Sequence, residues 1–311
     1  MKKALLQIHL AVLLWGFTGI LGRAISLDSP MLTWYRMLFT AIIMAVILTV
    51  RRQWVKVERR DLWQLVVVGC LMGIHWVAFY GSIKLANASI ALVCLSTASV
   101  FTALLDPYIN KSKKDPVEIV LGLLALTGVY FIYRFQQFFG AGILLGIIAA
   151  LLSAVFTVLN KRFVNTYPAR TMVFYEMSTG WLFITLLLPL QFYFLPGAQL
   201  LPRSTGLFSS AWYQNDWLWL IVISLCCTVW AQSLALNALK KLSSFTITLS
   251  VNMEPVYGIL LAIFFYKENR ELTAGFYLGM SLICLSVVLQ LLRVIRPSLS
   301  PGFLKEKGGI E

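Results

Sequence analysis

Charged residues are scarce in this sequence. Only 13% of its 311 residues are Asp, Glu, Lys or Arg, while 59% are hydrophobic. A soluble globular domain carries about 25% charged residues, and the shortage here extends along the whole chain. The composition therefore argues against a soluble domain and predicts an all-α integral membrane protein whose solvent is the lipid bilayer.

Residues that carry catalysis or bind cofactors are also few. The two histidines, His9 and His75, lie far apart in the sequence, and the five cysteines all fall within apolar stretches without the spacing of a metal site. Neither a nucleophile motif nor a glycine-rich phosphate-binding loop is present. We therefore predict that the chain is not an enzyme, that it needs no cofactor or metal, and that the cysteines are small buried side chains.

Long apolar segments make up most of the chain. A helix needs about 20 predominantly apolar residues to cross a bilayer. The first segment begins with basic residues, as a signal peptide does, but no small-residue cleavage site follows, so we expect it to remain as a helix. Ten segments can be drawn: residues 4–25, 31–50, 62–83, 88–109, 117–133, 141–160, 171–195, 216–239, 243–266 and 272–292.

The net charge of +13 is explained better by membrane orientation than by nucleic-acid binding. Lysines and arginines accumulate in the cytoplasmic loops of membrane proteins. With the N-terminus inside, 19 of the 26 lysines and arginines fall on the cytoplasmic side, six fall outside, and Arg36 lies within a helix. We therefore predict a multi-pass protein of the inner, cytoplasmic membrane, with both termini cytoplasmic and no nucleic-acid partner.

Two short stretches indicate an internal repeat. The triplets "YRM" and "YEM" place Arg36 and Glu176 in the same local frame near the starts of two apolar segments, and further matches occur at offsets of 139 and 156 residues. We predict a first five-helix repeat over residues 1–137, a second over 138–296, and a cytoplasmic tail over 297–311.

An odd number of helices in each repeat has a consequence for topology. The second five-helix repeat must cross the membrane upside down relative to the first, and inverted repeats of this kind are a transporter architecture with the substrate near the midplane. Arg36 and Glu176 then become symmetry-related gate or anchor positions near opposite membrane faces, where they cannot pair directly.

Several motifs resemble one transporter family. They are "LLWGFTGILGR" in the first segment, the intramembrane arginine of "YRM", "LANASIAL" before the fourth segment, and "NMEPVYGILLAIFFYKE" in the ninth. Together they resemble the EamA-type branch of the drug/metabolite transporter superfamily over nearly the whole chain. The resemblance implies ten helices in two inverted halves and a metabolite or amino-acid carrier, usually an exporter. The chain departs from the family at Ser99, where proline is common, so a weaker kink is expected there.

The ninth segment carries one polar face. Thr246, Ser250 and Glu254 recur every four residues, and Tyr257 follows three residues later. Pro255 has no N–H group, so the carbonyl group four residues before it loses its helical partner. A free carbonyl group is tolerated at mid-membrane only against protein or a wet cavity. This pattern favours a cavity-lining face over the alternative, a packing kink.

Glu254 has two interpretations that the sequence does not separate. A charge near the bilayer centre costs at least about 2.5–3.5 kcal/mol. The carboxylate is therefore either a protonatable site that couples transport to protons, or a structural latch that bonds to the first or fourth helix. Asn252, two residues earlier, is a further polar candidate.

Aromatic residues gather around His75 in the third segment. In "GIHWVAFYG", His75, Trp76 and Tyr80 stand on two adjacent stripes of the helix. Trp15, Trp76 and Trp230 fall near mid-span, away from the interfacial belt where tryptophan usually lies. Buried indoles need a partner for the N–H group, so we expect either an aromatic-lined pocket or ordinary core packing.

These observations predict a secondary transporter that works by alternating access at a midplane cavity. Its substrate would be a small metabolite such as an amino acid or another carboxylate or aromatic compound, and export is the usual direction in the resembling family. Partners would be the substrate, the bilayer, a proton as possible coupling ion, and a second copy in a possible homodimer. The alternative is a structural or assembly protein of the membrane. Candidate binding or gating residues are Arg36, His75, Trp76, Tyr80, Trp15, Glu176, Trp230, Ser250, Asn252, Glu254, Pro255 and Tyr257.

Overall fold

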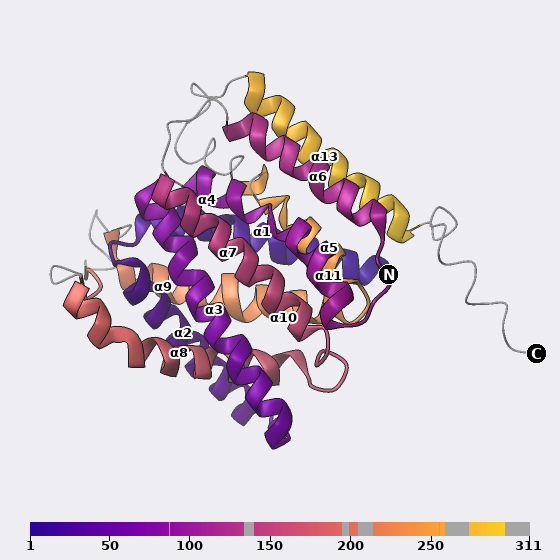
Figure 1. Ribbon diagram of the computed structural model, residues 1–311. Coiled ribbons are helices and arrows are strands. Elements are labelled where there is room, and N and C mark those ends of the chain that lie inside the picture. The colour runs from indigo at the N-terminus through magenta and orange to yellow at the C-terminus, as the bar shows by residue number, and fades with distance from the viewer. Residues whose placement is uncertain are drawn as a thin grey trace, which may run out of the picture.

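Helices account for the regular structure in the described part of the chain, as Figure 1 shows. The computed structural model describes residues 1–86, 88–133, 140–194, 199–204, 214–254, 256–258 and 274–295. Pro255 lies outside these ranges, and so does the part of the ninth predicted segment beyond residue 258. The all-helical class predicted from composition is confirmed for the residues described.

The N-terminal half of the chain forms six helical segments. Proline occurs at the start of α2 and at the first position of α6, where a helix needs no N–H donor and the fixed φ angle of proline fits the first turn. The segments are α1 (Lys2–Ala24), α2 (Ser29–Val50), α3 (Arg59–Leu85), α4 (Ala88–Leu95), α5 (Ala98–Ile109) and α6 (Pro116–Tyr133).

The C-terminal half contains a long helix with an unusual central turn. Residues 216–239 form one span, but its middle is a π-helix, in which hydrogen bonds reach back five residues. The segments of this half are α7 (Gly140–Asn160), α8 (Ala169–Phe194), α9 (Asp216–Ser224), the π-helix η2 (Leu225–Trp230), α10 (Ala231–Leu239), α11 (Ser244–Val251) and α13 (Ala274–Ile295).

The fourth predicted segment is interrupted without a proline. α4 ends at Leu95 and α5 begins at Ala98. Thr97 Oγ1 donates to the Cys94 carbonyl group at 2.7 Å, and Ser99 Oγ donates to the Ser96 carbonyl group at 3.1 Å. Hydroxyl groups that bond to nearby backbone carbonyls compete with helical hydrogen bonds and bend helices. Hydroxyl groups therefore accompany the interruption of this segment where the family often has proline, and the weaker kink expected at Ser99 stays a prediction.

Eight helices of the described part are long and apolar enough to cross a membrane. A shorter apolar helix, Pro116–Gly128, corresponds to the fifth predicted segment. The described chain is therefore that of an all-helical, multi-pass membrane protein. The remaining segment, 243–266, is described only through α11 and the turn that follows it.

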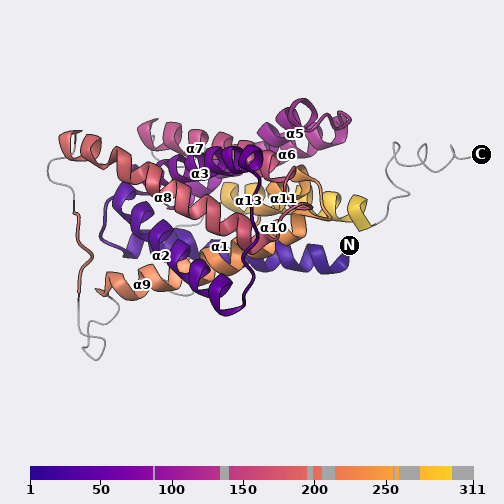
Figure 2. The same ribbon diagram turned by 90° about the horizontal axis from the view of Figure 1, so that it is seen from below.

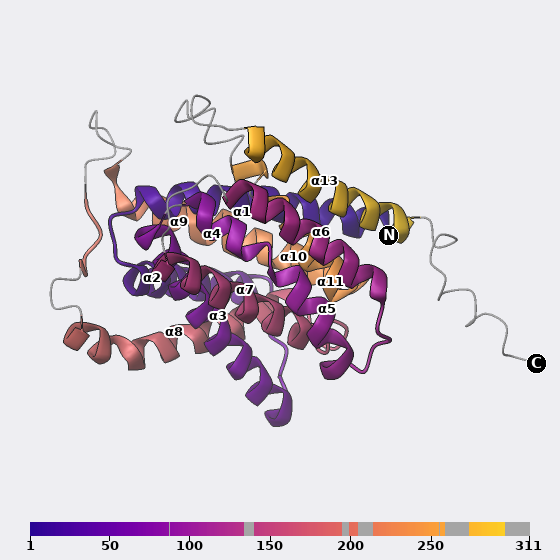
Figure 3. The ribbon, with the colours of Figure 1, turned by 45° about the horizontal axis from the view of Figure 1, so that its top comes forward.

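The helices from the two halves of the chain interlock. α3 packs against α7 and α8, α2 packs against α8, and α1 packs against α10. α6 and α13, one from each half, lie side by side at the edge of the bundle (Figures 1 and 3).

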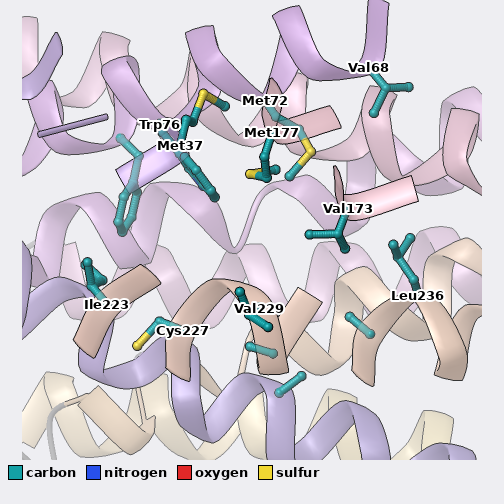
Figure 4. Packing of buried hydrophobic residues seen from close by; sticks show 14 of the residues in the cluster. Met37, Val68, Met72, Trp76, Val173, Met177, Ile223, Cys227, Val229 and Leu236 are labelled. Carbon is teal, nitrogen blue, oxygen red and sulfur yellow. The ribbon is translucent and has the colours of Figure 1, made fainter. Parts of the chain in front are cut away.

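Small residues allow close approach where α3 crosses α8. A Cβ atom at Gly180 would lie 2.6 Å from the carbonyl oxygen of Gly69, so only glycine fits at this contact. Around it, the side chains of Met37, Met72 and Met177 gather in the buried core (Figure 4). This crossing fixes α8 against the helices that carry the candidate site.

The described ends of the chain lie close together. The N-terminus at the start of α1 and the C-terminal end of α13 are neighbours at one end of the bundle in all three ribbon views (Figures 1, 2 and 3). The start of α1 and the end of α13 therefore lie on the same side of the helical bundle.

Candidate functional site

A cavity lies at the centre of the bundle, between helices of both halves. Side chains from α1, α2, α3, α7, α10 and α11, together with the junction of α4 and α5, line it. Its volume is about 70 Å³, enough for a few water molecules. Of the residues predicted from the sequence, Trp15, Arg36, His75, Trp76 and Glu254 line this cavity.

Arg36 is the most fully bonded charged residue of the cavity. Its side chain is buried, with a relative exposure of 1%. Nη1 donates to the Tyr80 hydroxyl group at 2.6 Å, and Nε donates to Thr228 Oγ1 at 2.8 Å. Nη2 donates to the Cys227 carbonyl oxygen at 3.2 Å. These bonds offset part of the cost of burying the guanidinium group and hold it in one orientation.

Trp76 supplies a second type of contact to Arg36. The guanidinium carbon lies 3.9 Å from the centroid of the indole ring, which is a close cation–π arrangement. Tyr80 is fully buried behind Arg36, and its hydroxyl group accepts from the arginine without lining the cavity. The helical stripe of Trp76 and Tyr80 that the sequence indicated thus meets α2 at Arg36.

The π-helix positions backbone and hydroxyl oxygens toward Arg36. The N–H group of Ala231 bonds to the carbonyl oxygen of Cys226, five residues earlier. Within this turn the Cys227 carbonyl oxygen accepts from Arg36 and also from Trp15 Nε1, at 3.0 Å. Cys227 and Thr228 were not among the residues predicted from the sequence, because nothing in their residue types indicates a π-helix, a form that often occurs at functional sites.

Glu254 faces the same cavity from the opposite half of the chain. It belongs to the helical turn that follows α11 and is buried, with an exposure of 4%. The Arg36 guanidinium group lines the same cavity. Both residues belong to the described part of the chain, and there they do not form an ion pair. The guanidinium group of Arg36 and the carboxyl group of Glu254 therefore line one small cavity without a direct ion pair.

The rest of the predicted polar face of α11 points elsewhere. Ser250 Oγ donates to the Thr246 carbonyl group at 2.7 Å, and Thr246 Oγ1 accepts from Gln290 of α13 at 3.0 Å. Asn252 Nδ2 donates to Ser99 Oγ at 3.3 Å. Turns at 252 and 253 interrupt the helix before Glu254, so the residues do not share one face. Within α11 itself, Ile247, Thr248 and Val251 line the cavity.

His75 is held firmly at the cavity wall. Its Nδ1 atom lies 2.7 Å from the Ala149 carbonyl oxygen, and because a carbonyl oxygen only accepts, Nδ1 carries the proton. The ring is stacked on Phe79 and meets Phe156 edge-on at a centroid distance of 5.3 Å. The fixed tautomer leaves Nε2 as the atom able to accept a hydrogen bond from a ligand.

Glu176 occupies a different place from Arg36. Its carboxylate is fully buried on α8, outside the lining of the central cavity. Asn160 and Gln232 are its polar neighbours, but neither makes a well-formed hydrogen bond with it among the described residues. Asn160 and Gln232 line a smaller cavity of about 30 Å³ that adjoins the central one through shared residues such as Trp15 and Phe156.

Two predicted residues stand away from the central cavity. Trp230, at the end of η2, is 54% exposed and belongs to a separate groove on the outside of the bundle. Tyr257 is partly buried beside α1, where its Cβ atom would be 3.1 Å from a Cβ atom placed at Gly16. Pro255 lies outside the described residues, so the structure does not place it.

Hydrogen bonds join the two halves at both ends of the bundle. At one end Asp216 is fully buried, accepts from the Ser26 N–H and hydroxyl groups, and pairs with Arg203 at 3.3 Å. At the other end Asn110 Nδ2 donates to the Val158 carbonyl oxygen at 3.0 Å, and Ser244 bonds to Asp106. The cavity therefore lies between two bonded ends.

The comparisons with known proteins agree with this arrangement. The sequence profile of the EamA-like transporter family matches the chain twice, over residues 2–134 and 140–292. The chain belongs to the EamA-like transporter family. Two matches in one chain indicate a duplicated repeat of this EamA unit, and the family forms part of the drug/metabolite transporter superfamily.

A curated relative and a solved structure extend the comparison. The EamA-family chain is 23% identical over 300 residues to the uncharacterized transporter YxxF of Bacillus subtilis (strain 168), a match that covers 94% of this chain and 90% of the relative. One solved crystal structure of a protein matches with a TM-score of 0.69 and 16% identity, covering 96% of this chain and 99% of the other. The latter shows a shared fold and nothing about the substrate.

The repeat seen in the sequence also bears on the site. Phe17-Thr18 and Phe156-Thr157 correspond at an offset of 139 residues. In the structure, Thr18, Phe156 and Thr157 all line the central cavity. The residues that match between the two halves therefore include residues of the central cavity.

Proposed function

We propose that this EamA-family transporter is a secondary transporter that binds a small carboxylate-bearing metabolite, with an amino acid as the best fit, in its central cavity. It would have ten spanning segments in two inverted repeats of five, covering residues 1–137 and 138–296, and would work by alternating access. Helices of both halves line the cavity, as expected when a substrate is held at the interface of two repeats.

The observation that carries this proposal is the incomplete bonding of Arg36 inside the cavity. A guanidinium group has five N–H groups, and the bonds to Thr228, Tyr80 and Cys227 use one on each nitrogen. One N–H group remains on Nη1 and one on Nη2. Two N–H groups of one guanidinium group can bind the two oxygens of a carboxylate with parallel hydrogen bonds, the geometry that we propose for these two.

Glu254 provides the complementary charge for the rest of an amino acid. With the substrate carboxylate at Arg36, a substrate ammonium group would stand toward Glu254, since both residues line the same small cavity without pairing to each other in the described structure. A zwitterion neutralises both charges at once, so its binding offsets the cost of leaving each of them buried.

The remaining walls suit an apolar or aromatic substrate side chain. Met72, Phe79, Phe156 and the indole rings of Trp15 and Trp76 face the cavity. Because the volume of about 70 Å³ holds only a few water molecules, substrate binding must be accompanied by movement of the lining helices. We propose export from the cytoplasm, the usual direction of transport in the family. We also propose that the loops rich in lysine and arginine and both termini lie in the cytoplasm.

Counterflow in liposomes tests this function. The purified protein is reconstituted with an unlabelled amino acid inside, and uptake of the same labelled amino acid is measured across a panel that includes amines lacking the carboxylate and acids lacking the amine. We expect exchange of one or more amino acids and little exchange of either deaminated or decarboxylated analogue. Well-folded protein that exchanges none of the panel would favour the alternative, a structural or assembly role in the membrane.

A further inference from the structure

A second hollow lies on the outside of the bundle and shares no lining residue with the central cavity. It is a groove of about 520 Å³ between α1, α2 and α10. Its apolar wall is formed by Leu10 and Leu13 of α1, Met44 and Ile47 of α2, Trp230 of η2 and Leu234 of α10. On each helix these positions are three or four residues apart, so the wall runs along the helix axes.

Two arginines stand at one end of this outer groove. Arg51 follows the last residue of α2, and Arg170 is the second residue of α8. Arg170 Nη1 donates to Gln53 Oε1 at 2.7 Å, which leaves its charge without an acidic partner. Within the described part of the chain, neither arginine forms an ion pair.

The depth of the arginines in the membrane indicates which part of a lipid they contact. Arg51 caps a membrane-spanning helix, so it lies at the level of the lipid headgroups, while Ile47 and Met44 of the same face lie one and two turns deeper, within the hydrocarbon. A basic end and an apolar wall in this order match a phospholipid, with its phosphate outward and its acyl chain inward.

We propose that the outer groove is a binding site for one anionic phospholipid. Its phosphate is held between the guanidinium groups of Arg51 and Arg170, and one acyl chain lies along the wall formed by α1, α2 and α10. Ser233 and Asn237, which line the groove on α10, provide polar groups beside the ester region. The charge decides the class of lipid: two unpaired cations favour a net negative headgroup over phosphatidylcholine, which carries its own cation.

The volume and lining also decide between a lipid and a free anion. An inorganic phosphate ion would occupy only the arginine end and leave the apolar wall uncovered. The exposed indole of Trp230 in this wall is explained by contact with an acyl chain, whereas it contributes nothing to the central cavity.

Quenching of Trp230 by brominated lipids tests the site. The purified protein is placed in nanodiscs of phosphatidylcholine that contain increasing fractions of phosphatidylglycerol brominated on the acyl chains. The signal of Trp230 is the difference in fluorescence between the protein and its Trp230→Phe variant. A parallel series uses brominated phosphatidylcholine, and a third adds inorganic phosphate at millimolar concentration as a competitor.

The proposal predicts half-maximal quenching at a lower fraction of the anionic lipid than of the zwitterionic lipid. The double variant Arg51→Gln/Arg170→Gln should shift this fraction upward at least about tenfold, since each arginine loses a charge-assisted hydrogen bond. The control Arg52→Gln/Arg59→Gln removes the same charge from exposed positions outside the groove and should shift it little.

Three results would overturn the proposal. Equal quenching by the two lipids would show that the groove takes any acyl chain. An equal shift in the control variant would show that general attraction of anionic lipid to basic loops, and not this site, explains the preference. Full displacement of the lipid by inorganic phosphate would show a free-anion site. Because the readout is lipid contact, none of these results depends on transport activity.

Discussion

The backbone carbonyl group of Cys227 accepts a hydrogen bond from the side chain of Arg36, across the interface between the two halves of the chain. The same oxygen accepts from Trp15 Nε1. One turn of π-helix thereby ties an intramembrane cation of α2 and an indole of α1 to the second half. The orientation of the Arg36 side chain in the cavity thus depends on an irregular backbone segment 191 residues away in the sequence.

Replacing Arg36 by lysine tests whether substrate binding needs only the positive charge or also the planar geometry of the guanidinium group. Lysine keeps the positive charge but cannot offer two parallel N–H groups or stack on Trp76 in the same way. We expect Arg36→Lys to lower kcat/KM for transport by at least about tenfold, because at least one charge-assisted hydrogen bond to the substrate is lost. Arg52→Lys, at an exposed position, is the matched control. Wild-type kinetics in both Arg36→Lys and Arg36→Ala would remove this residue from the binding site.

Thr228 should matter through its hydroxyl group. Thr228→Val keeps the shape and removes the acceptor of Arg36 Nε, which leaves a buried charged N–H group unpaired. Such a loss costs about 1–3 kcal/mol, and we expect a lower Tm together with a raised KM. Thr228→Ser retains the acceptor and should stay close to the wild type in both. A drop in Tm with an unaltered KM would limit Thr228 to a structural role.

Glu254→Gln distinguishes the two interpretations of this carboxylate. If Glu254 takes up and releases a proton during transport, flux in the wild type depends on pH, and the glutamine variant binds substrate but shows a flattened pH profile. If it is a latch, the variant expresses or folds poorly and has no selective change in pH dependence. Expression, substrate binding and flux between pH 5 and 9, measured together with Glu176→Gln, provide the comparison. A folded, active Glu254→Gln protein with the wild-type pH profile contradicts both interpretations.

The hydrogen bonds around Asp216 should control access at one end of the cavity. Asp216→Asn removes the carboxylate charge, which accepts hydrogen bonds from Ser26 and forms an ion pair with Arg203. The two halves should then separate more readily at this end. We expect a cysteine placed at the cavity residue Thr18 to react about ten- to a hundredfold faster with a small membrane-impermeant thiol reagent in this variant. Asp115→Asn, which removes the ion pair with Arg293 elsewhere in the fold, is the control. Equal labelling rates of the cysteine at position 18 in the otherwise wild-type protein, the Asp216→Asn variant and the Asp115→Asn variant would show that Asp216 is not part of a gate.

Topology follows from the distribution of lysine and arginine and has a direct test. Ser204 and Ser112 are exposed and belong to loops predicted on opposite sides of the membrane. We expect Ser204→Cys to react with an impermeant maleimide in intact cells and Ser112→Cys to react only after permeabilisation. The reverse pattern would invert the proposed orientation.

The main features of the fold could be predicted from the sequence because membrane helices have a strong compositional signal. Apolar segments of about 20 residues located the spanning helices, and the weak match between "YRM" and "YEM" indicated the duplication. The interruptions were less visible. Hydroxyl groups near Thr97 break the fourth segment, and the π-helix at Leu225–Trp230 differs from an α-helix by a change of hydrogen-bond register that no residue type dictates.

Several residues of the site could be predicted from the sequence, but their arrangement in space could not. Arg36, His75 and Trp76 attracted notice because polar and aromatic groups are costly or need partners inside a membrane. Helical periodicity placed Ser250 on the same face as Glu254, but the turn at 252 and 253 ends that register. Mid-span position similarly suggested a cavity role for Trp230, whereas depth in the membrane does not say which way a side chain faces.

The pairing of α6 with α13 has a mechanical consequence. A Cβ atom at Gly128 of α6 would lie 2.5 Å from the carbonyl oxygen of Gly279 of α13, so the two backbones touch where the first half meets the second at the outer edge. Neither helix lines the central cavity. If the halves move relative to each other during transport, this contact keeps them at a constant separation along one edge, and the movement becomes a rotation about the α6–α13 axis.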